Sequence, residues 1–453
     1  MTARATATLA GALAGALVAG GCGGATGTFS LELVTAPGST LLDEVTRARL
    51  TLSVPYRQVE ATRDDDGRFR LVLDVPADGP AGQVTFEGFD DTGAVVAWGR
   101  SGALPIAAID ASVAIYVAAP QSLAAAPVAL DPPRTELGVA RFGFGVLLVG
   151  GADASGAPLD TIDVYDVYRH RLIDGEPAPG ARAGAAVGAG ISGYAYVFGG
   201  RGPDGATGTF WRFDTTVAPA GQWLAISNQP ELARAPAIAA PLRAEGFVVT
   251  GSPPVVMDGL SLSATTLATA PGLAGTLTAV QQNDAIYVVA AGDGTGAGGL
   301  VRLGPAGIRE IGDVASAVRT GHGAVGARDA QVLVVGGAVA GVPTTTSIVA
   351  RPATDVYLEV DGLLATPRTG AAVAGNGEVA LVAGGRDAGG AILGDAELID
   401  LTTLTRIATI PMVVPRAGAV AASLASGQIL VAGGVDDAGL PVGTLEIFTP
   451  AAP

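Results

Sequence analysis

An apolar segment that ends in a pair of glycines recurs seven times between residues 145 and 434. Five copies are complete, and their second glycines are Gly151, Gly200, Gly337, Gly385 and Gly434. Two copies, at Gly251 and Gly292, keep the apolar segment but only one glycine of the pair. The marked glycines lie 49, 51, 41, 45, 48 and 49 residues apart, room for four short antiparallel strands and too long for ankyrin or tetratricopeptide repeats. The period therefore predicts a seven-bladed β-propeller.

The composition agrees with an all-β protein. Glycine accounts for 67 of the 453 residues and proline for 29, whereas only 15% of residues are charged, which suits many short strands joined by tight turns. The formal net charge is −16, and the sequence contains no lysine. Because a field of that sign repels polyanions, we do not expect nucleic acid as a partner.

The N-terminus has the features of a bacterial lipoprotein signal. An apolar run from Leu9 to Ala19 follows the single charge of Arg4 and is too short to span a bilayer. It leads to Cys22, the only cysteine, whose position resembles the acylated cysteine of the lipoprotein family. We interpret residues 1–21 as a signal peptide and 22–27 as the linker of a lipid anchor. Gly23 after the cysteine favours the outer membrane of a bacterial envelope by analogy with lipoprotein sorting. The alternatives are an ordinary secretory signal with an incidental cysteine or a misassigned start.

Residues 28–120 lack the glycine pairs and show short alternating strands instead. Apolar and polar side chains alternate around Leu31, Leu50 and Leu71, the pattern of half-buried strands, and Asp91-Thr92-Gly93 marks a hairpin. About six such strands predict an immunoglobulin-like β-sandwich. We assign the acidic residues 64–66 to a solvated turn, because nothing nearby supplies the six or so oxygens of a calcium site.

Residues 121–133 form a linker into the propeller, which we assign to 134–453. The last repeat supplies three strands before the chain ends at Pro453. An uncovered sheet edge is a liability, so we predict that the apolar stretch Ala125 to Leu130 is the missing outer strand and joins the two ends of the ring.

The repeats resemble those of the kelch family, which includes the galactose-oxidase-like propellers. In the second repeat an aromatic third strand, Thr209 to Asp214, is followed by Trp223 at the start of the fourth, as in a kelch repeat. The resemblance covers roughly residues 134–450 and implies the fold. We expect the glycine pairs to be part of the scaffold, because a residue without Cβ can turn sharply against the neighbouring blade.

An arginine marks six of the seven repeats at one equivalent position, 17 or 18 residues before the second glycine. These residues are Arg134, Arg182, Arg234, Arg319, Arg368 and Arg416. One hypothesis is structural: each guanidinium, with its five donors, satisfies loop carbonyls or a carboxylate and ties adjacent blades together. The other is a rim that binds an anion such as a carboxylate, a sulfate or an acidic glycan.

Catalytic constellations are nearly absent from the sequence. Its two histidines, His170 and His322, belong to different repeats, and we interpret His322 as structural. The copper site of galactose oxidase needs a tyrosine cross-linked to a cysteine, and the only cysteine of this chain belongs to the signal. No zinc cluster can be assembled from the sequence either. We therefore predict no catalytic residues, no metal and no cofactor.

Two functions remain open. The first is a non-enzymatic, lipid-anchored envelope protein that binds a protein or glycan through the propeller loops. The alternative is a carbohydrate-active propeller, such as a sugar mutarotase, epimerase or hydrolase, which would need paired carboxylates beside the arginines.

Overall fold

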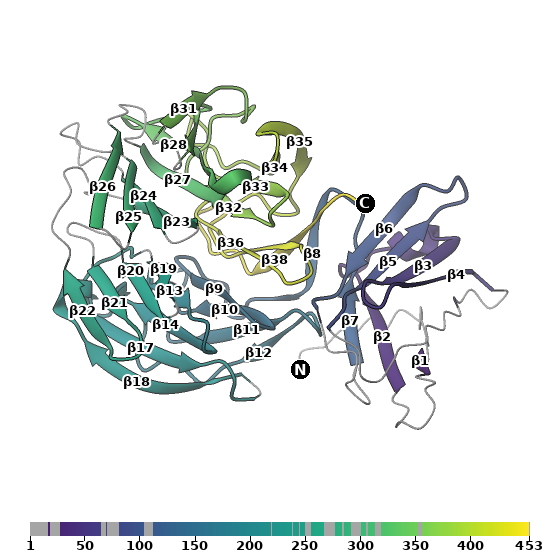
Figure 1. Ribbon diagram of the computed structural model, residues 1–453, viewed down its shortest axis with the longest axis horizontal. Coiled ribbons are helices and arrows are strands. Elements are labelled where there is room, and N and C mark those ends of the chain that lie inside the picture. Colours follow the sequence, from purple (N-terminus) through teal and green to yellow (C-terminus); the bar gives the residue numbers. More distant parts are fainter. Residues whose placement is uncertain are drawn as a thin grey trace.

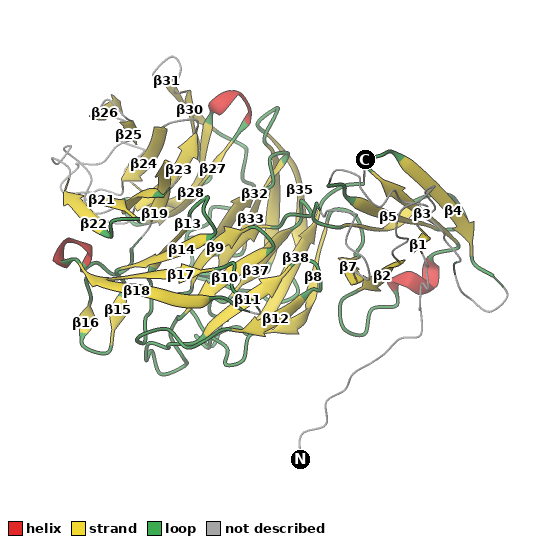
Figure 2. Ribbon diagram, turned by 60° about the horizontal axis from the view of Figure 1, so that its bottom comes forward, coloured by secondary structure: helices red, strands yellow, loops and turns green. Residues whose placement is uncertain are grey.

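The protein is all-β throughout the part that can be described. The computed structural model describes residues 17–18, 28–64, 69, 81–103, 112–218, 220–237, 239–243, 245–249, 255–266, 277–282, 285–290, 300–304, 307–312, 319–351 and 356–452. Antiparallel sheets account for most of this chain (Figure 1). The helices among these residues are short 3₁₀ segments, drawn red in Figure 2: η1 (Leu41–Glu44), η2 (Pro230–Leu232) and η4 (Arg328–Ala330).

The first domain consists of two sheets around one core. The four-stranded antiparallel sheet has the order β4 (Arg57–Thr62), β3 (Arg47–Leu52), β5 (Val84–Phe89) and β6 (Val95–Arg100). The second sheet has the order β1 (Leu17–Val18), β2 (Thr28–Val34) and β7 (Ser112–Tyr116), with β2 and β7 parallel. Leu50, Phe86 and Ile115 from the two sheets share a buried core. The strand expected around Leu71 lies outside the described residues.

Seven further sheets of four or five strands, numbered sheet 1 to sheet 7 here, contain the glycine-pair repeats in the described chain. Sheet 1 is β9 (Gly138–Phe142), β10 (Gly145–Val149), β11 (Ile162–Asp166) and β12 (Arg171–Asp174). Sheet 2 is β13 (Ala186–Ala189), β14 (Tyr194–Phe198), β17 (Thr209–Asp214) and β18 (Gln222–Asn228). Sheet 3 is β19 (Ala239–Arg243), β20 (Gly246–Val249), β21 (Val255–Asp258) and β22 (Ser263–Thr266). Sheet 4 is β23 (Leu277–Gln282), β24 (Ala285–Ala290), β25 (Leu300–Gly304) and β26 (Gly307–Gly312).

Sheets 5 to 7 complete this series. Sheet 5 is β27 (Arg319–Gly326), β28 (Val332–Val339), β30 (Ser347–Arg351) and β31 (Val356–Val360), with β29 (Val342–Pro343) beside β28. Sheet 6 is β32 (Ala372–Gly375), β33 (Val379–Ala383), β34 (Asp395–Asp400) and β35 (Thr405–Pro411). Sheet 7 is β36 (Val420–Ser423), β37 (Ile429–Ala432), β38 (Thr444–Thr449) and β8 (Ser122–Ala129).

The first strands of the seven sheets contact one another in chain order. β9 contacts β13, and the series continues through β19, β23, β27, β32 and β36, which contacts β9 again. Figure 1 shows the sheets side by side around a common centre. The sequence predicts that the stretch Ala125 to Leu130 pairs with the last repeat as its outer strand. This pairing is confirmed, because β8 is hydrogen-bonded antiparallel to β38 as the fourth strand of sheet 7.

The glycine pairs allow close contact between neighbouring sheets. After β33, Gly384 and Gly385 have φ of +64° and +95°, a region that side chains disfavour. The Gly385 N–H donates to the Arg416 carbonyl at 2.9 Å, and a Cβ on Gly384 would overlap that same carbonyl. The pair therefore joins sheet 6 to the backbone that precedes sheet 7.

The first domain is bonded to sheets 7 and 1. Arg100 Nε donates to the Ser426 carbonyl at 2.9 Å, and Gln428 Nε2 donates to the Tyr116 carbonyl at 3.2 Å. The Tyr116 N–H donates to His170 Nε2 at 3.0 Å. These contacts all lie at the end of the sheets that carries the β36–β37 and β11–β12 turns, which we call the turn end.

Candidate functional site

The repeated arginines are interior residues. Five have an exposed fraction of at most 4%: Arg134, Arg182, Arg319, Arg368 and Arg416. Arg234 is half-buried, and burial lowers its pKa. Each precedes the first strand of its sheet or, as Arg319 does, begins it, at the end opposite to the turn end.

Three of the guanidiniums share one hydrogen-bond pattern. Arg368 Nη1 donates to the carbonyls of Gly384 at 3.0 Å and Asp395 at 3.2 Å. Arg416 repeats this with Gly433 and Thr444, and Arg319 with Gly336 and Thr346. Each of these three guanidiniums thus connects the first glycine of its own pair to the backbone just before or at the start of the third strand.

A buried carboxylate completes the contacts in sheets 6 and 7. Arg368 Nη2 lies 2.8 Å from Glu397 Oε1, and Arg416 Nη2 lies 2.6 Å from Glu446 Oε1. Both glutamates have an exposed fraction of 0%. Glu446 also accepts the N–H groups of Val413 and Val414 at 2.9 and 3.1 Å. The carboxylate therefore holds the loop before the arginine as well as the arginine itself.

Sequence reasoning missed these carboxylates, although they have a regular spacing. They lie 29 residues after the arginine in sheets 1 and 6, as Asp163 and Glu397, and 30 residues after it in sheet 7, as Glu446. Arg134 Nη2 contacts Asp163 in the same way. In sheet 6, Asp395 also lies 2.9 Å from Arg368 Nη2. The acids beside these three arginines are therefore engaged in ion pairs.

Sheets 2 and 5 have a different residue type at the position of this acid. Position 29 after Arg182 is Trp211, whose ring lies 4.1 Å from the guanidinium, and position 29 after Arg319 is Ile348. Arg182 donates to the Gly199 carbonyl at 2.7 Å and to Thr209 Oγ1 at 2.5 Å. Burial lowers the pKa of both Arg182 and Arg319 to about 10.

The arginine geometry is that of the structural hypothesis. Five guanidiniums are buried and donate to carbonyl, hydroxyl or carboxylate oxygens of their own sheets. An anion-binding rim needs donors that face solvent, and these five side chains do not provide it.

The two histidines occupy separate buried positions. His322 Nδ1 lies 3.0 Å from the Arg319 carbonyl, in agreement with the structural interpretation of this residue. His170 lies between the first domain and sheet 1, where Nε2 accepts the Tyr116 N–H and Nδ1 lies 2.8 Å from the Tyr165 hydroxyl. Since Nε2 accepts, Nδ1 carries the proton of a neutral ring. Burial lowers the pKa of His170 to about 3.

The hairpins that follow the glycine pairs form an exposed surface at the end opposite to the turn end. We define this loop face by the hairpins 152–158, 201–206, 386–392 and 435–441. The carboxylates of Asp153, Asp387 and Asp436 each accept two N–H groups of their own turn at 2.8 to 3.0 Å. Backbone bridges tie these hairpins to the segment before the first strand, as between Arg386 and Thr369. The loop face is therefore exposed and internally braced.

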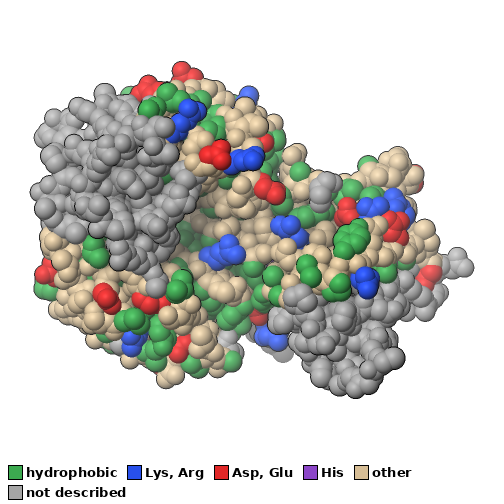
Figure 3. Space-filling view, viewed as in Figure 1, with side chains coloured by type: hydrophobic (Ala, Val, Ile, Leu, Met, Phe, Trp, Pro, Cys, Tyr) green, Lys and Arg blue, Asp and Glu red, His purple; other side chains and the backbone are tan. Residues whose placement is uncertain are grey.

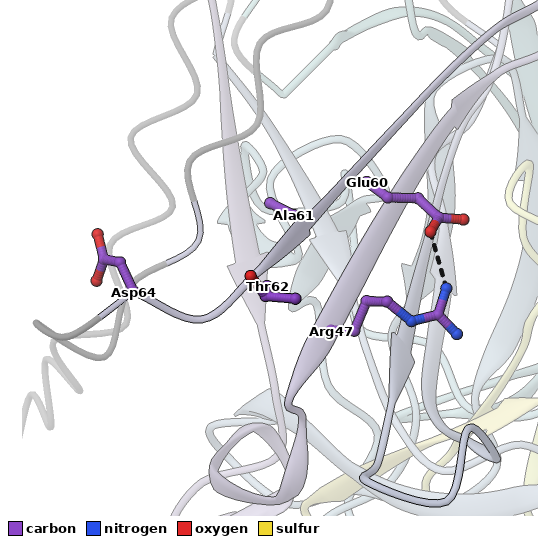
Figure 4. Close-up of a pocket in the computed structure, with 5 residues that line it drawn as sticks. All are labelled: Arg47, Glu60, Ala61, Thr62 and Asp64. Atoms are coloured by element: carbon purple, nitrogen blue, oxygen red, sulfur yellow. Dashed lines mark hydrogen bonds and ion pairs between the residues drawn. The ribbon is translucent and has the colours of Figure 1, made fainter.

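A shallow depression of about 450 Å³ lies on the first domain beside β3 and β4 (Figure 4). It is lined by Arg47, Glu60, Ala61, Thr62 and Asp64. Arg47 Nη1 and Arg49 Nε lie 2.8 and 2.6 Å from the two oxygens of Glu60. Both guanidiniums also stack on Phe89, 4.0 and 4.8 Å from the ring centroid. Because these charges satisfy one another, we assign no ligand to the depression.

Charge is dispersed over the surface that Figure 3 displays, where acidic and basic side chains are interspersed. Within the described residues there is no cluster of three or more metal-ligating side chains. No helix in that part of the chain has the length and apolar character needed to cross a membrane. Cys22 lies outside the described residues.

The sequence matches no protein-family model, and no curated protein is significantly similar to it.

Proposed function

We propose that this chain is a non-catalytic binding protein of the bacterial envelope. In this proposal a seven-bladed kelch-type propeller follows an immunoglobulin-like sandwich, and lipid on Cys22 anchors the protein to the outer membrane. Three features support the propeller: the glycine-pair period, the contact of each first strand with the next around to β9, and the pairing of β8 with β38. Full closure removes exposed sheet edges.

The observation that carries the binding role is the position of the loop face. The first domain is bonded to the turn end through Arg100, Gln428 and Tyr116, so the loop face lies at the other end of the sheets. Loops held by a rigid scaffold are the usual place for recognition. The first domain follows the anchor in the chain and would hold the loop face away from the membrane, toward a protein or glycan.

The binding role is tested with the full-length, detergent-extracted protein on a glycan array and against an envelope lysate. Asp437→Arg changes an exposed loop-face residue, and Glu378→Arg makes the same kind of change at the turn end. We expect saturable binding that Asp437→Arg weakens and Glu378→Arg leaves unchanged. Conversion of an array glycan to a new product would replace this proposal with an enzymatic one.

The lipid anchor is tested by the intact mass of the membrane-extracted protein. We expect a mature N-terminus at Cys22 with added acyl mass. An N-terminus elsewhere, together with an unmodified Cys22, would show that the chain carries an ordinary secretory signal.

A further inference from the structure

One open sheet edge differs from the others in its composition. β18 is the outer strand of sheet 2, and β17 is its only hydrogen-bonded neighbour among the described strands. It lies on the outside of the seven sheets in Figure 1. An edge strand presents N–H and C=O groups that face away from its partner, and proteins usually blunt such edges with charges, proline or short length.

The other outer strands of the described chain have these protections. The outer strands of sheets 1, 4, 5 and 6 contain charged residues, namely Arg171 and Asp174 in β12, Arg309 and Glu310 in β26, Glu359 in β31, and Arg406 in β35. In sheet 7 the outer strand β8 contains Pro127, and in sheet 3 the outer strand β22 is only four residues long. β18 has seven residues, Gln-Trp-Leu-Ala-Ile-Ser-Asn, with neither charge nor proline.

β18 exposes large apolar side chains on one face. Leu224 and Ile226 are 44% and 60% exposed. The other face is packed, because the Trp223 ring lies 4.8 Å from that of Phe213 and its Nε1 donates to the Glu176 carbonyl at 3.2 Å. A strand that is already held in place loses little conformational freedom when a second strand pairs with it.

The sequence of β18 is complementary to itself. In an antiparallel pair centred on Ala225, Leu224 of one copy lies opposite Ile226 of the other. Side chains opposite each other across two strands stabilise the pair, whereas like charges there destabilise it. The chain has a formal charge of −16, so two copies repel each other at charged surfaces and not along this uncharged strand. A charged strand of a different protein would find no counter-charge on β18, so the edge favours a second copy.

We propose that β18 binds β18 of a second copy of this chain in an antiparallel pair around a twofold axis at Ala225. The two copies of sheet 2 then form one continuous sheet, in which the outward N–H and C=O groups of both strands are hydrogen-bonded. Leu224 and Ile226 are covered by their counterparts in the other copy. The pairing uses the outer edge of sheet 2 and not the loop face, so it does not rest on the proposed binding role.

Analytical ultracentrifugation of the full-length protein in density-matched detergent measures the dissociation constant of the dimer. Leu224→Lys and Ile226→Glu each place a charge against an apolar residue twice in the dimer, so each should weaken association about tenfold or more. Ile407→Lys is the matched control and should change the constant less than twofold. Ile407 is 40% exposed and is the extra residue of a bulge in β35, as Leu224 is in β18. A protein that stays monomeric at every concentration, or a dimer that neither substitution weakens, overturns the proposal.

A mixture of the two variants tests the register of the pair. In a mixed dimer the new lysine of one copy lies opposite the new glutamate of the other, and the second contact between Leu224 and Ile226 is the natural one. An equal mixture should therefore recover a dissociation constant within about threefold of the natural value, which neither variant reaches alone. A mixture that associates no more tightly than the single variants overturns the pairing around Ala225.

Amide hydrogen exchange tests the same contact without any substitution. In the natural protein, the outward N–H groups of β18 should exchange about tenfold more slowly above the dissociation constant than below it. The N–H groups of β35 should exchange at the same rate at both concentrations. Equal exchange of β18 at both concentrations, or protection confined to another strand, overturns the proposal.

Discussion

Sheets 7 and 2 each bury an arginine at the same position of the repeat, but the electrostatic surroundings of the two arginines differ. Arg416 and Arg182 occupy equivalent positions, both are at least 96% buried, and both donate to the first glycine of their pair, Gly433 and Gly199. Arg416 faces the buried carboxylate of Glu446, whereas Arg182 faces the ring of Trp211. Both sheets have the arginine donors, but of the two only sheet 7 has a carboxylate beside them.

The pKa values follow this difference. Burial lowers the pKa of Arg182 to about 10, with no acid to oppose it. Burial also lowers the pKa of Arg416, but the charge and hydrogen bond of Glu446 counteract the shift. The comparison teaches that the guanidinium makes the same carbonyl contact with or without a carboxylate, and that the carboxylate adds an interaction that can be removed separately.

The largest effect is expected from Arg416→Met. The substitution leaves the Glu446 carboxylate buried without its cation, which costs about 3 to 5 kcal/mol of the free energy of unfolding. Urea unfolding of the full-length protein measures it. Glu446→Gln in the same chain removes the stranded charge, so the double variant should be more stable than Arg416→Met alone. A loss below about 1 kcal/mol would show that the ion pair contributes little.

His170 extends the comparison to a buried base with neutral partners. Its folded pKa of about 3 lies below the value of about 6.5 expected for the unfolded chain. The folded state therefore binds the proton less well, and the stability present above pH 6.5 is lost as the pH falls toward 3. Between pH 7 and pH 5 the loss amounts to about 2 kcal/mol.

The control for this titration is His170→Gln, whose amide oxygen can still accept the Tyr116 N–H. Denaturant unfolding at a series of pH values measures the free energy of unfolding of both proteins. The value for the natural protein minus the value for His170→Gln should fall steadily below pH 6.5. A difference that stays constant down to pH 5 would mean that the histidine does not titrate on unfolding as described.

Local features of the sequence were enough to predict the strands of the repeats. The expected third strand of the second repeat, at 209–214, matches β17. Alternation and glycine pairs are properties of a few neighbouring residues, so they can be read along the chain. The pairing of β8 with β38 could also be predicted, because a sheet edge left without a strand requires a partner.

The partners of the arginines could not be predicted in the same way. Asp163, Glu397 and Glu446 occupy one structural position, but sheet 2 has Trp211 there and sheet 5 has Ile348, so the acid is not a constant mark of the repeat. The contact between His170 and Tyr116 joins two domains across 54 residues. Such contacts depend on how finished sheets pack, and periodicity along the chain does not encode them.

The smallest effect is expected from Arg182→Met. No carboxylate is stranded by this change, so the cost comes from the Gly199 carbonyl, from Thr209 Oγ1 and from lost stacking on Trp211. Those terms amount to about 1 to 2 kcal/mol, and removal of a poorly compensated buried charge offsets part of them. Urea unfolding beside Arg416→Met is the direct measurement, and Arg182→Met should be more stable by about 2 kcal/mol. Equal losses in the two variants would mean that the shared carbonyl contacts, and not the counter-charge, determine how strongly each arginine stabilises its sheet.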